Sequence, residues 1–397
     1  MAISTLDLPC GLETVRKAIV HAQWLGHRGS QGTGPAATLK AIEHLGYVQL
    51  DTLSVVARAH HHTLWNRLPQ YRLHHVDRLQ YEGKIFEHWA HALAILPMKD
   101  YRFSLPIMNR VAAGKGHWHA RNRRQMDSVL ARIRNEGALM AKDFNDKPRS
   151  KAMWARAPSK QALEQLFMEG ELMIPYRKNF HKVYDLRERV LPSGVNTQEP
   201  TIEEFCQHLV RSYLQVNILG QARQIGYLRK GLGTALLSAL AVLQEEGLVI
   251  RARLGKQEFF LKPESMELME SLLPSCGFRI LSPFDNAIIQ RQRTRQLFQF
   301  DYQIECYKKR ENRQFGYFCL PLLYRNQLVG RLDAKADRKS RRLRLLHLYI
   351  EKTVDNKEQF YRAFRAELQR FARFNDCDHF VLEQISGCKK ASLLMAG

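Results

Sequence analysis

The hydrophobic positions of this chain repeat one local pattern along its length. A stretch with apolar residues at helical spacing ends at a glycine, and a short run of strand-forming residues follows. The clearest copies have helical stretches at residues 36–45, 160–169 and 234–246, which end at Gly46, Gly170 and Gly247. A glycine ends a helix readily because it adopts the left-handed backbone conformation without steric cost. A fainter copy runs from residue 126 through Gly137 to residue 141.

The second and third of these units continue into a hairpin with a basic turn. Strands are predicted at residues 172–174 and 181–186 around Arg177-Lys178-Asn179, and at 248–254 and 257–261 around Gly255-Lys256. Helix, glycine, strand, basic turn and strand is the order expected of a winged helix. A single copy also fits many α/β folds. Three copies without the spacing of βαβ units favour tandem winged helices.

The pattern changes near Cys276. Strand-forming residues then dominate at 297–302, 315–323, 328–332 and 343–350, separated by turn signals. Residues 356–375 have helical periodicity, with Phe360, Phe364, Leu368 and Phe371 on one face. We therefore predict an α+β fold in which tandem winged-helix domains precede a C-terminal antiparallel β-barrel-like domain with a terminal helix.

Breaks in these patterns suggest four regions. The first winged-helix region is placed at residues 1–120, the second winged helix at 121–195, the third at 196–275 and the β-rich domain at 276–397. Residues 191–200, which are rich in Pro, Ser, Gly and Asn, form the clearest linker.

Charge narrows the range of partners. The 397 residues include 61 Lys and Arg against 39 Asp and Glu, a net charge of +22 that is spread along the whole chain. This distribution favours a folded surface that faces a polyanion, and the phosphate backbone of nucleic acid is the first candidate. RNA is an alternative on charge alone. An anionic membrane would require an amphipathic or lipid anchor, and the sequence shows neither.

The cysteines and the N-terminus bear on the compartment. The seven cysteines are scattered and include no CxxC pair, which predicts neither a disulfide framework nor a zinc site. Residues 1–10 lack the charged and apolar regions of a signal peptide. The longest nearly apolar run, around residues 235–243, is too short to span a bilayer. We expect a monomeric cytoplasmic protein, located at the nucleoid, with no metal and no organic cofactor.

Basic residues beside predicted turns and helix ends are candidate phosphate contacts, although each also fits a solvated surface. The segment His117-Trp118-His119, with its flanking arginines, resembles an aromatic and basic nucleic-acid contact. The full set of candidate DNA-binding residues is Arg58, His60, His61, Arg121, Arg123, Arg124, Arg177, Lys178 and Lys256. His60-His61-His62 also suggests a metal tract, but neighbouring histidines rarely converge on one ion.

The strand predicted after Gly46 carries two polar residues of interest. In a strand over residues 47–51, Val48 and Leu50 would face one side, and Gln49 and Asp51 the other. The two polar side chains would then lie roughly 6.5–7 Å apart along the strand and could hold a water between them. Taken alone, the pair more readily describes the polar side of an amphipathic strand.

Several blocks of sequence resemble the bacterial winged-helix DNA glycosylases that unhook interstrand crosslinks. The first block runs from His44 through Gln49-Leu-Asp51 to Ala57-Arg-Ala-His60-His61. Further blocks follow in the family's order: Phe86-Glu-His-Trp-Ala-His91, Leu281-Ser-Pro-Phe-Asp285-Asn, Leu297-Phe-Gln-Phe-Asp-Tyr302, Gly316-Tyr-Phe-Cys-Leu-Pro321 and Val329-Gly-Arg331-Leu-Asp333.

The resemblance implies tandem winged helices, a barrel-like C-terminal domain and a catalytic motif of Gln, an apolar residue, and Gln or Asp. It assigns catalysis to Gln49 and Asp51. Because Asp51 occupies the second polar position, the chain resembles the Gln-x-Asp branch of the family, which implies a broader lesion range than the Gln-x-Gln branch. The implied activity is monofunctional hydrolysis of N7-alkylated purines, including crosslinked ones, in double-stranded DNA.

Two other functions fit the residues without the resemblance. A non-enzymatic winged-helix transcription regulator would read base edges and would not need Asp51. An RNA- or ribosome-associated basic protein would prefer structured RNA to duplex DNA.

Overall fold

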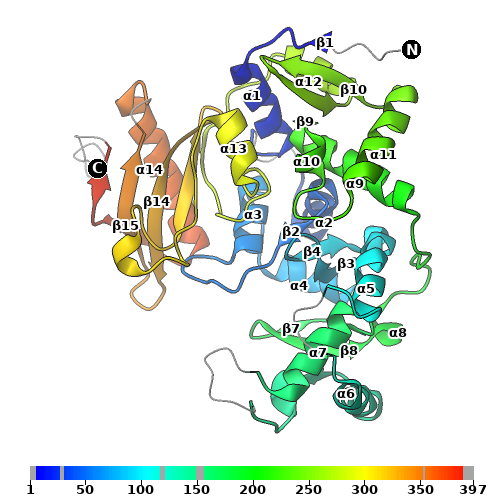
Figure 1. Cartoon of the computed structure of the whole chain (residues 1–397). Helices are drawn as coiled ribbons and strands as arrows, with labels where there is room; N and C mark the ends of the chain where they lie inside the picture. The colour runs from blue at the N-terminus through cyan, green and yellow to red at the C-terminus, as the bar shows by residue number, and fades with distance from the viewer. Residues whose placement is uncertain (1–5, 27–30, 117–120, 149–155, 352–353, 388–397) are drawn as a thin grey trace. The chain divides into compact units, whose positions relative to one another are not determined.

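The computed structural model describes residues 6–26, 31–116, 121–148, 156–351 and 354–387 (Figure 1). The chain divides into two compact units. One comprises Met1–Thr33, Val48–Tyr71 and Leu209–Gly397, and the other comprises Gly34–Tyr47 and Arg72–His208. The segment His117-Trp118-His119 lies outside the described residues.

The smaller unit combines short helices with two small β-structures. Its helices include α2 (Gly34–Leu45), α4 (His74–Tyr81), α5 (Leu105–Ala112), α6 (Arg123–Glu136), α7 (Pro158–Met168) and α8 (Arg187–Val190), with 3₁₀ turns η1 (Met98–Ser104) and η2 (Ala141–Asp143). Strands β3 (Ile85–Trp89) and β4 (Leu93–Pro97) form one hairpin. In the other structure β8 (His181–Leu186) pairs with β5 (Leu139–Met140), β6 (Leu172–Met173) and β7 (Arg177–Lys178).

The predicted helix–glycine–strand order is confirmed in this unit. Helix α7 ends before Gly170, whose φ of +78° turns the chain into β6. The buried face of α7 packs with α6 in one hydrophobic core, which includes Leu163, Leu166, Val129 and Ile133. These side chains fall at helical spacing in the sequence, so burying them fixes which face of each helix turns inward.

The larger unit begins with β1 (Leu6–Asp7) and α1 (Leu12–Ala22), and its next segment holds β2 (Val48–Gln49) and α3 (Ala59–Arg67). Its middle segment contains β9 (Leu219–Gly220), α10 (Ala222–Ile225), α11 (Gly233–Glu245), β10 (Ile250–Leu254), β11 (Gln257–Leu261) and α12 (Glu264–Glu270). Helix α9 (Ile202–Asn217) precedes them. The sheet order is β1-β10-β11-β9, with β1 parallel to β10. Gly247, with a φ of +70°, again ends the helix before the hairpin.

The C-terminal part of the larger unit is a curled sheet covered by one long helix (Figure 1). Its strands are β12 (Phe278–Ile280), β13 (Cys319–Tyr324), β14 (Gln327–Asp337), β15 (Arg342–Ile350), β16 (His379–Leu382) and β17 (Ile385–Ser386), in the order β12-β13-β14-β15-β16 with β17 also beside β15. Helix α13 (Arg291–Phe298) and η3 (Arg310–Asn312) lie between β12 and β13 in the chain. The α+β class is thereby confirmed.

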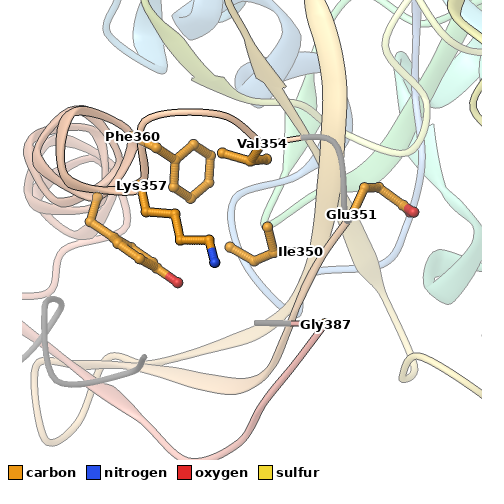
Figure 2. Close-up of a pocket in the computed structure, with 7 residues that line it drawn as sticks. Ile350, Glu351, Val354, Lys357, Phe360 and Gly387 are labelled. Carbon is orange, nitrogen blue, oxygen red and sulfur yellow. The ribbon is translucent and has the colours of Figure 1, made fainter. Parts of the chain in front are cut away.

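Helix α14 (Lys357–Phe374) matches the predicted terminal helix. Its buried face includes Phe360, Phe364, Leu368 and Phe371, and the ring of Phe364 lies 4.9 Å from that of Phe278 on β12. A pocket of about 180 Å³ opens where its first turn meets the end of β15 (Figure 2). Lys357 extends across this pocket, whereas Glu351 points away from it. The helix is therefore held by its aromatic stripe, as the sequence indicates.

Two details of the predicted fold are wrong. The C-terminal sheet is mixed, because β16 and β17 pair in parallel with β15. Helix α14 crosses over between β15 and β16 and returns the chain in the same direction. Residues 297–302 are not a strand: α13 ends at Phe298, and Gln299 takes a left-handed φ of +52°. Phe298, Phe300 and Tyr302 are all buried, so the aromatic alternation reflects packing at a helix end.

Candidate active site

Gln49 and Asp51 lie at the end of a very short strand. Strand β2 covers Val48 and Gln49 alone, so the prediction of a strand over residues 47–51 is too long. The spacing argument for a shared strand face therefore does not extend to Asp51. Gln49 is buried at 8% exposure between the buried side chains of Val48 and Leu50, whereas Asp51 is half-buried in the following loop.

The carboxylate of Asp51 is partly desolvated. Its Oδ1 accepts a hydrogen bond from the backbone N–H of Leu53 at 2.7 Å. Burial raises the pKa of Asp51 above the ordinary aspartate value, and the Leu53 hydrogen bond offsets part of that rise. A carboxylate with a raised pKa is a stronger base than a solvated one, which suits proton abstraction from water.

Two residues that sequence reasoning missed lie within electrostatic range of Asp51. The charge of Asp51 contributes to raised pKa values of Cys306 and Tyr307, although burial is the larger cause at both residues. They are more than 250 residues away in the chain and belong to none of the quoted motifs. The blocks ending at Tyr302 and beginning at Gly316 bracket them, which is the nearest signal in the sequence.

Helix α3 carries the histidine tract and is fixed to the C-terminal sheet. The ring of His62 is fully buried, with Nε2 2.8 Å from the carbonyl oxygen of Ile280, and burial lowers its pKa to about 4. His61 lies with Nδ1 2.6 Å from the hydroxyl of Tyr71, and its pKa is also lowered to about 4, chiefly by burial. His60 is 3% exposed, which leaves it little surface for a DNA contact. No group of three or more metal-ligating side chains occurs in the described part of the chain.

A buried ion pair joins α3 to the turn after β12. Arg67 Nη1 and Nη2 donate to Asp285 Oδ2 and Oδ1, each at 2.9 Å, and both side chains are 0% exposed. Arg67 also donates to Gln23 Oε1 at 3.0 Å. Asp285 belongs to the Ser-Pro-Phe-Asp block, so this block anchors the helix that follows the Gln49–Asp51 segment.

The predicted phosphate contacts fall into three groups. Arg123 and Arg124 are exposed in the first turn of α6, and Lys178 and Lys256 are exposed at hairpin turns. Arg58 is half-buried at the N-cap of α3. Arg121 instead pairs with Glu169 at 2.7 Å and Arg177 with Glu87 at 2.6 Å, so their guanidinium groups already bind carboxylates.

None of the helices among the described residues is long and apolar enough to cross a membrane.

The family of the chain follows from comparison with known proteins. The family model described as "DNA glycosylase AlkZ-like" matches residues 42–374, which is most of the chain and includes the Gln49–Asp51 segment. The chain therefore belongs to the AlkZ-like DNA glycosylases, and it is a DNA glycosylase, an enzyme of DNA repair. Among solved structures, the fold is similar to that of the DNA glycosylase AlkZ of Streptomyces sahachiroi. The two share 14% sequence identity at a TM-score of 0.64, over 94% of this chain and 99% of that one.

Proposed function

We propose that this enzyme is a monofunctional glycosylase that hydrolyses the N-glycosidic bond of N7-alkylated purines in duplex DNA. Unhooking of interstrand crosslinks is part of this activity, and the product is an abasic site. The observation that carries the proposal is the partly desolvated carboxylate of Asp51 directly after the buried Gln49. The match to the AlkZ-like family includes this pair, which supports assigning the chemistry to it.

The reaction starts from a base that already leaves easily. Alkylation at N7 makes the purine cationic, so little acid catalysis is needed as the bond from C1′ to the base breaks. Positive charge then develops on the sugar, and an ionised Asp51 stabilises it. Gln49 positions a water whose oxygen bonds to C1′ while Asp51 accepts its proton, and the bonding electrons leave with the base.

The composition of the segment fits this chemistry. Residues 44–58 contain no lysine that could form a Schiff base with the sugar, which favours hydrolysis without strand cleavage. The proposed steps also require neither a metal nor an organic cofactor.

Two parts of the chain support the proposed winged helices. In both β5-β8-β6 and β9-β11-β10, the third strand in sequence pairs with the first and the second, ignoring the short β7. A helix precedes the hairpin in each, namely α7 and α11. We assign these to the second winged helix (121–195) and the third (196–275), with the first region at 1–120 and the β-rich domain at 276–397.

The charge of +22 suits duplex DNA as partner. We also propose a monomer that acts at the nucleoid in the cytoplasm.

The test is base release from defined duplexes. Purified protein is incubated with a duplex containing 7-methylguanine, with a duplex carrying an N7-linked interstrand crosslink, and with an undamaged duplex of the same sequence. We expect abasic sites in the first two, detected as strand breaks only after alkali treatment. Breaks before alkali would contradict the monofunctional mechanism, and intact lesions would contradict the proposed substrate.

The non-enzymatic regulator is not retained, because the family is one of enzymes. A binding assay on undamaged DNA is still informative, since a glycosylase should show no preference for a palindromic sequence.

A further inference from the structure

The strand β13 is preceded by an irregular segment, residues 305–317, which we name the Tyr307 loop. Its first residue, Glu305, is buried at 3% exposure. Glu305 Oε2 accepts hydrogen bonds from the backbone N–H groups of Phe315 at 2.8 Å and Gly316 at 3.3 Å. Lys308 Nζ donates to Glu305 Oε1 at 2.9 Å. One carboxylate therefore ties the two ends of the loop together.

A second carboxylate fixes the loop to the sheet. Asp333 of β14 accepts hydrogen bonds from the backbone N–H groups of Tyr317 at 2.8 Å and Phe318 at 3.2 Å. Gly316 approaches Asp333 so closely that a Cβ at this position would lie 2.0 Å from Oδ2, and its φ is +138°. Glycine is needed here for both reasons. The Gly316 and Asp333 blocks thus have a common structural task, which is to hold the Tyr307 loop.

The same strand also holds the segment that follows Asp51. The backbone N–H of Ala336, three residues after Asp333 on β14, donates to the carbonyl oxygen of Val55 at 2.9 Å. The loop and the Asp51 segment are therefore attached to the same strand, at positions three residues apart. The electrostatic interaction of Asp51 with Cys306 and Tyr307 agrees with this placement.

The loop presents an exposed aromatic ring among cations. Tyr307 is 83% exposed. Lys309 and Arg310 are exposed and form no ion pair with a residue that the structure describes. Lys308 and Arg313 contact the loop itself, since Arg313 Nε donates to the Lys308 carbonyl at 3.0 Å. A ring that stacks on bases, beside cations that bind phosphate, is the arrangement by which proteins hold an unpaired or distorted strand.

We propose that the Tyr307 loop is a DNA-binding element of the active site, in which Tyr307 stacks on a base beside the lesion while Lys309 and Arg310 bind the flanking phosphates. This inference rests on the proposed catalytic role of Asp51. It assigns Tyr307 a positioning role: stacking holds the damaged nucleotide against Asp51. The hydroxyl is not needed for this, whereas the ring is.

The experiment separates binding from rate. Dissociation constants for a 7-methylguanine duplex and single-turnover rate constants at saturating enzyme are measured for Tyr307→Ala, Tyr307→Phe and the double variant Lys309→Ala/Arg310→Ala. Tyr307→Ala should lose about 10-fold in the saturating rate, and Tyr307→Phe should stay within about 2-fold of wild type. The double variant should bind more weakly, with the slope of log Kd against log salt reduced by about 2, and should keep its saturating rate within about 2-fold.

Matched controls come from exposed residues of the other compact unit. Tyr81 has the same 83% exposure as Tyr307, and Lys40 and Lys84 are also exposed. Tyr81→Ala and Lys40→Ala/Lys84→Ala should change neither measurement as much as the loop variants. Equal losses in these controls would show a general effect of surface charge or stability and would overturn the proposal.

The remaining outcomes separate the loop from the proposed function. An active wild type whose Tyr307→Ala variant keeps its full rate contradicts the role of the loop and leaves the glycosylase function intact. A wild type that releases no base from any of the damaged duplexes contradicts the proposed function itself. Asp51→Asn should bind the duplex like wild type. A loss of affinity in that variant would contradict the division of binding to the Tyr307 loop and catalysis to Asp51.

Discussion

Asp51 and Asp285 lie in the same compact unit and in segments that resemble the same family, yet their surroundings are opposite. Asp285 is 0% exposed, and both of its oxygens accept hydrogen bonds from Arg67. Its Oδ1 also accepts from the backbone N–H of Ala287 at 3.0 Å. Asp51 is half-buried, and among the described residues its carboxylate accepts a hydrogen bond only from Leu53.

The difference suits the two aspartates to different roles. A fully buried carboxylate that accepts three hydrogen bonds from the protein is closed to water and substrate, so Asp285 fixes α3 in place. A carboxylate with spare acceptors, partly withdrawn from water, can take a proton, as we propose for Asp51. Resemblance to a motif therefore does not by itself separate the two roles, whereas the hydrogen-bond partners do.

The largest expected effect is the loss of stability when the buried Arg67–Asp285 ion pair is broken. Arg67→Met leaves the buried charge of Asp285 without its partner, which should lower the free energy of unfolding by about 3–5 kcal/mol. Denaturant unfolding monitored by circular dichroism measures this change. Arg78→Met, at an exposed ion pair on α4, is the control and should barely change stability. An Arg67→Met protein as stable as wild type would break the comparison.

The parts of the fold that were predicted correctly carry local signals. Helix α14 has an aromatic stripe at helical spacing, and β8 and β11 begin and end where the sequence places them. Errors arose where tertiary packing decides the backbone. The run from Leu297 to Tyr302 alternates like a strand, but α13 ends at Phe298 within it, and its aromatic residues are buried around that helix end.

The candidate site was predictable only in part. Gln49 and Asp51 were found by resemblance, because their local pattern describes an ordinary strand. The neighbours that complete each environment come from distant parts of the chain. Arg67, which binds Asp285, is 218 residues from it, and Tyr307, which interacts electrostatically with Asp51, is more than 250 residues from it. The spacing of hydrophobic residues within one segment carries no information on contacts between residues so far apart in the sequence.

The next effect concerns Asp51, whose carboxylate accepts a single hydrogen bond from the described residues. Asp51→Asn should lower the single-turnover rate of 7-methylguanine release by about 10²-fold or more, with little change in stability. Because burial raises the pKa of Asp51, the acid limb of the wild-type rate profile should lie above the ordinary aspartate range, with activity lost as pH falls through it. The same limb should be missing from the residual activity of Asp51→Asn. A variant with full activity would remove Asp51 from the mechanism.

A smaller effect tests whether α3 is held by neutral, buried groups. The pKa of His62 is lowered to about 4, so between that pH and about 6.5 the unfolded chain binds a proton that the folded chain does not. Stability should therefore fall as pH falls through this window, by up to about 1.4 kcal/mol per pH unit for this histidine. In His62→Gln the dependence should become shallower by that amount. An unchanged slope from pH 6.5 to 4 would show that His62 does not titrate as its burial implies.

The smallest effect applies the same contrast to two neighbouring cations of β7. Arg177 is bound to Glu87 and to the carbonyl oxygen of Phe180 at 2.7 Å, whereas Lys178 is exposed at the hairpin turn. If Lys178 binds a phosphate, Lys178→Ala should reduce the slope of log Kd against log salt by about 1 for any duplex, damaged or not. Arg177→Ala should instead act mainly on stability, because it leaves Glu87, a side chain at 2% exposure, without its ion-pair partner. Equal changes in salt dependence for the two variants would contradict this prediction. They would mean that an ion pair within the protein does not prevent Arg177 from binding DNA.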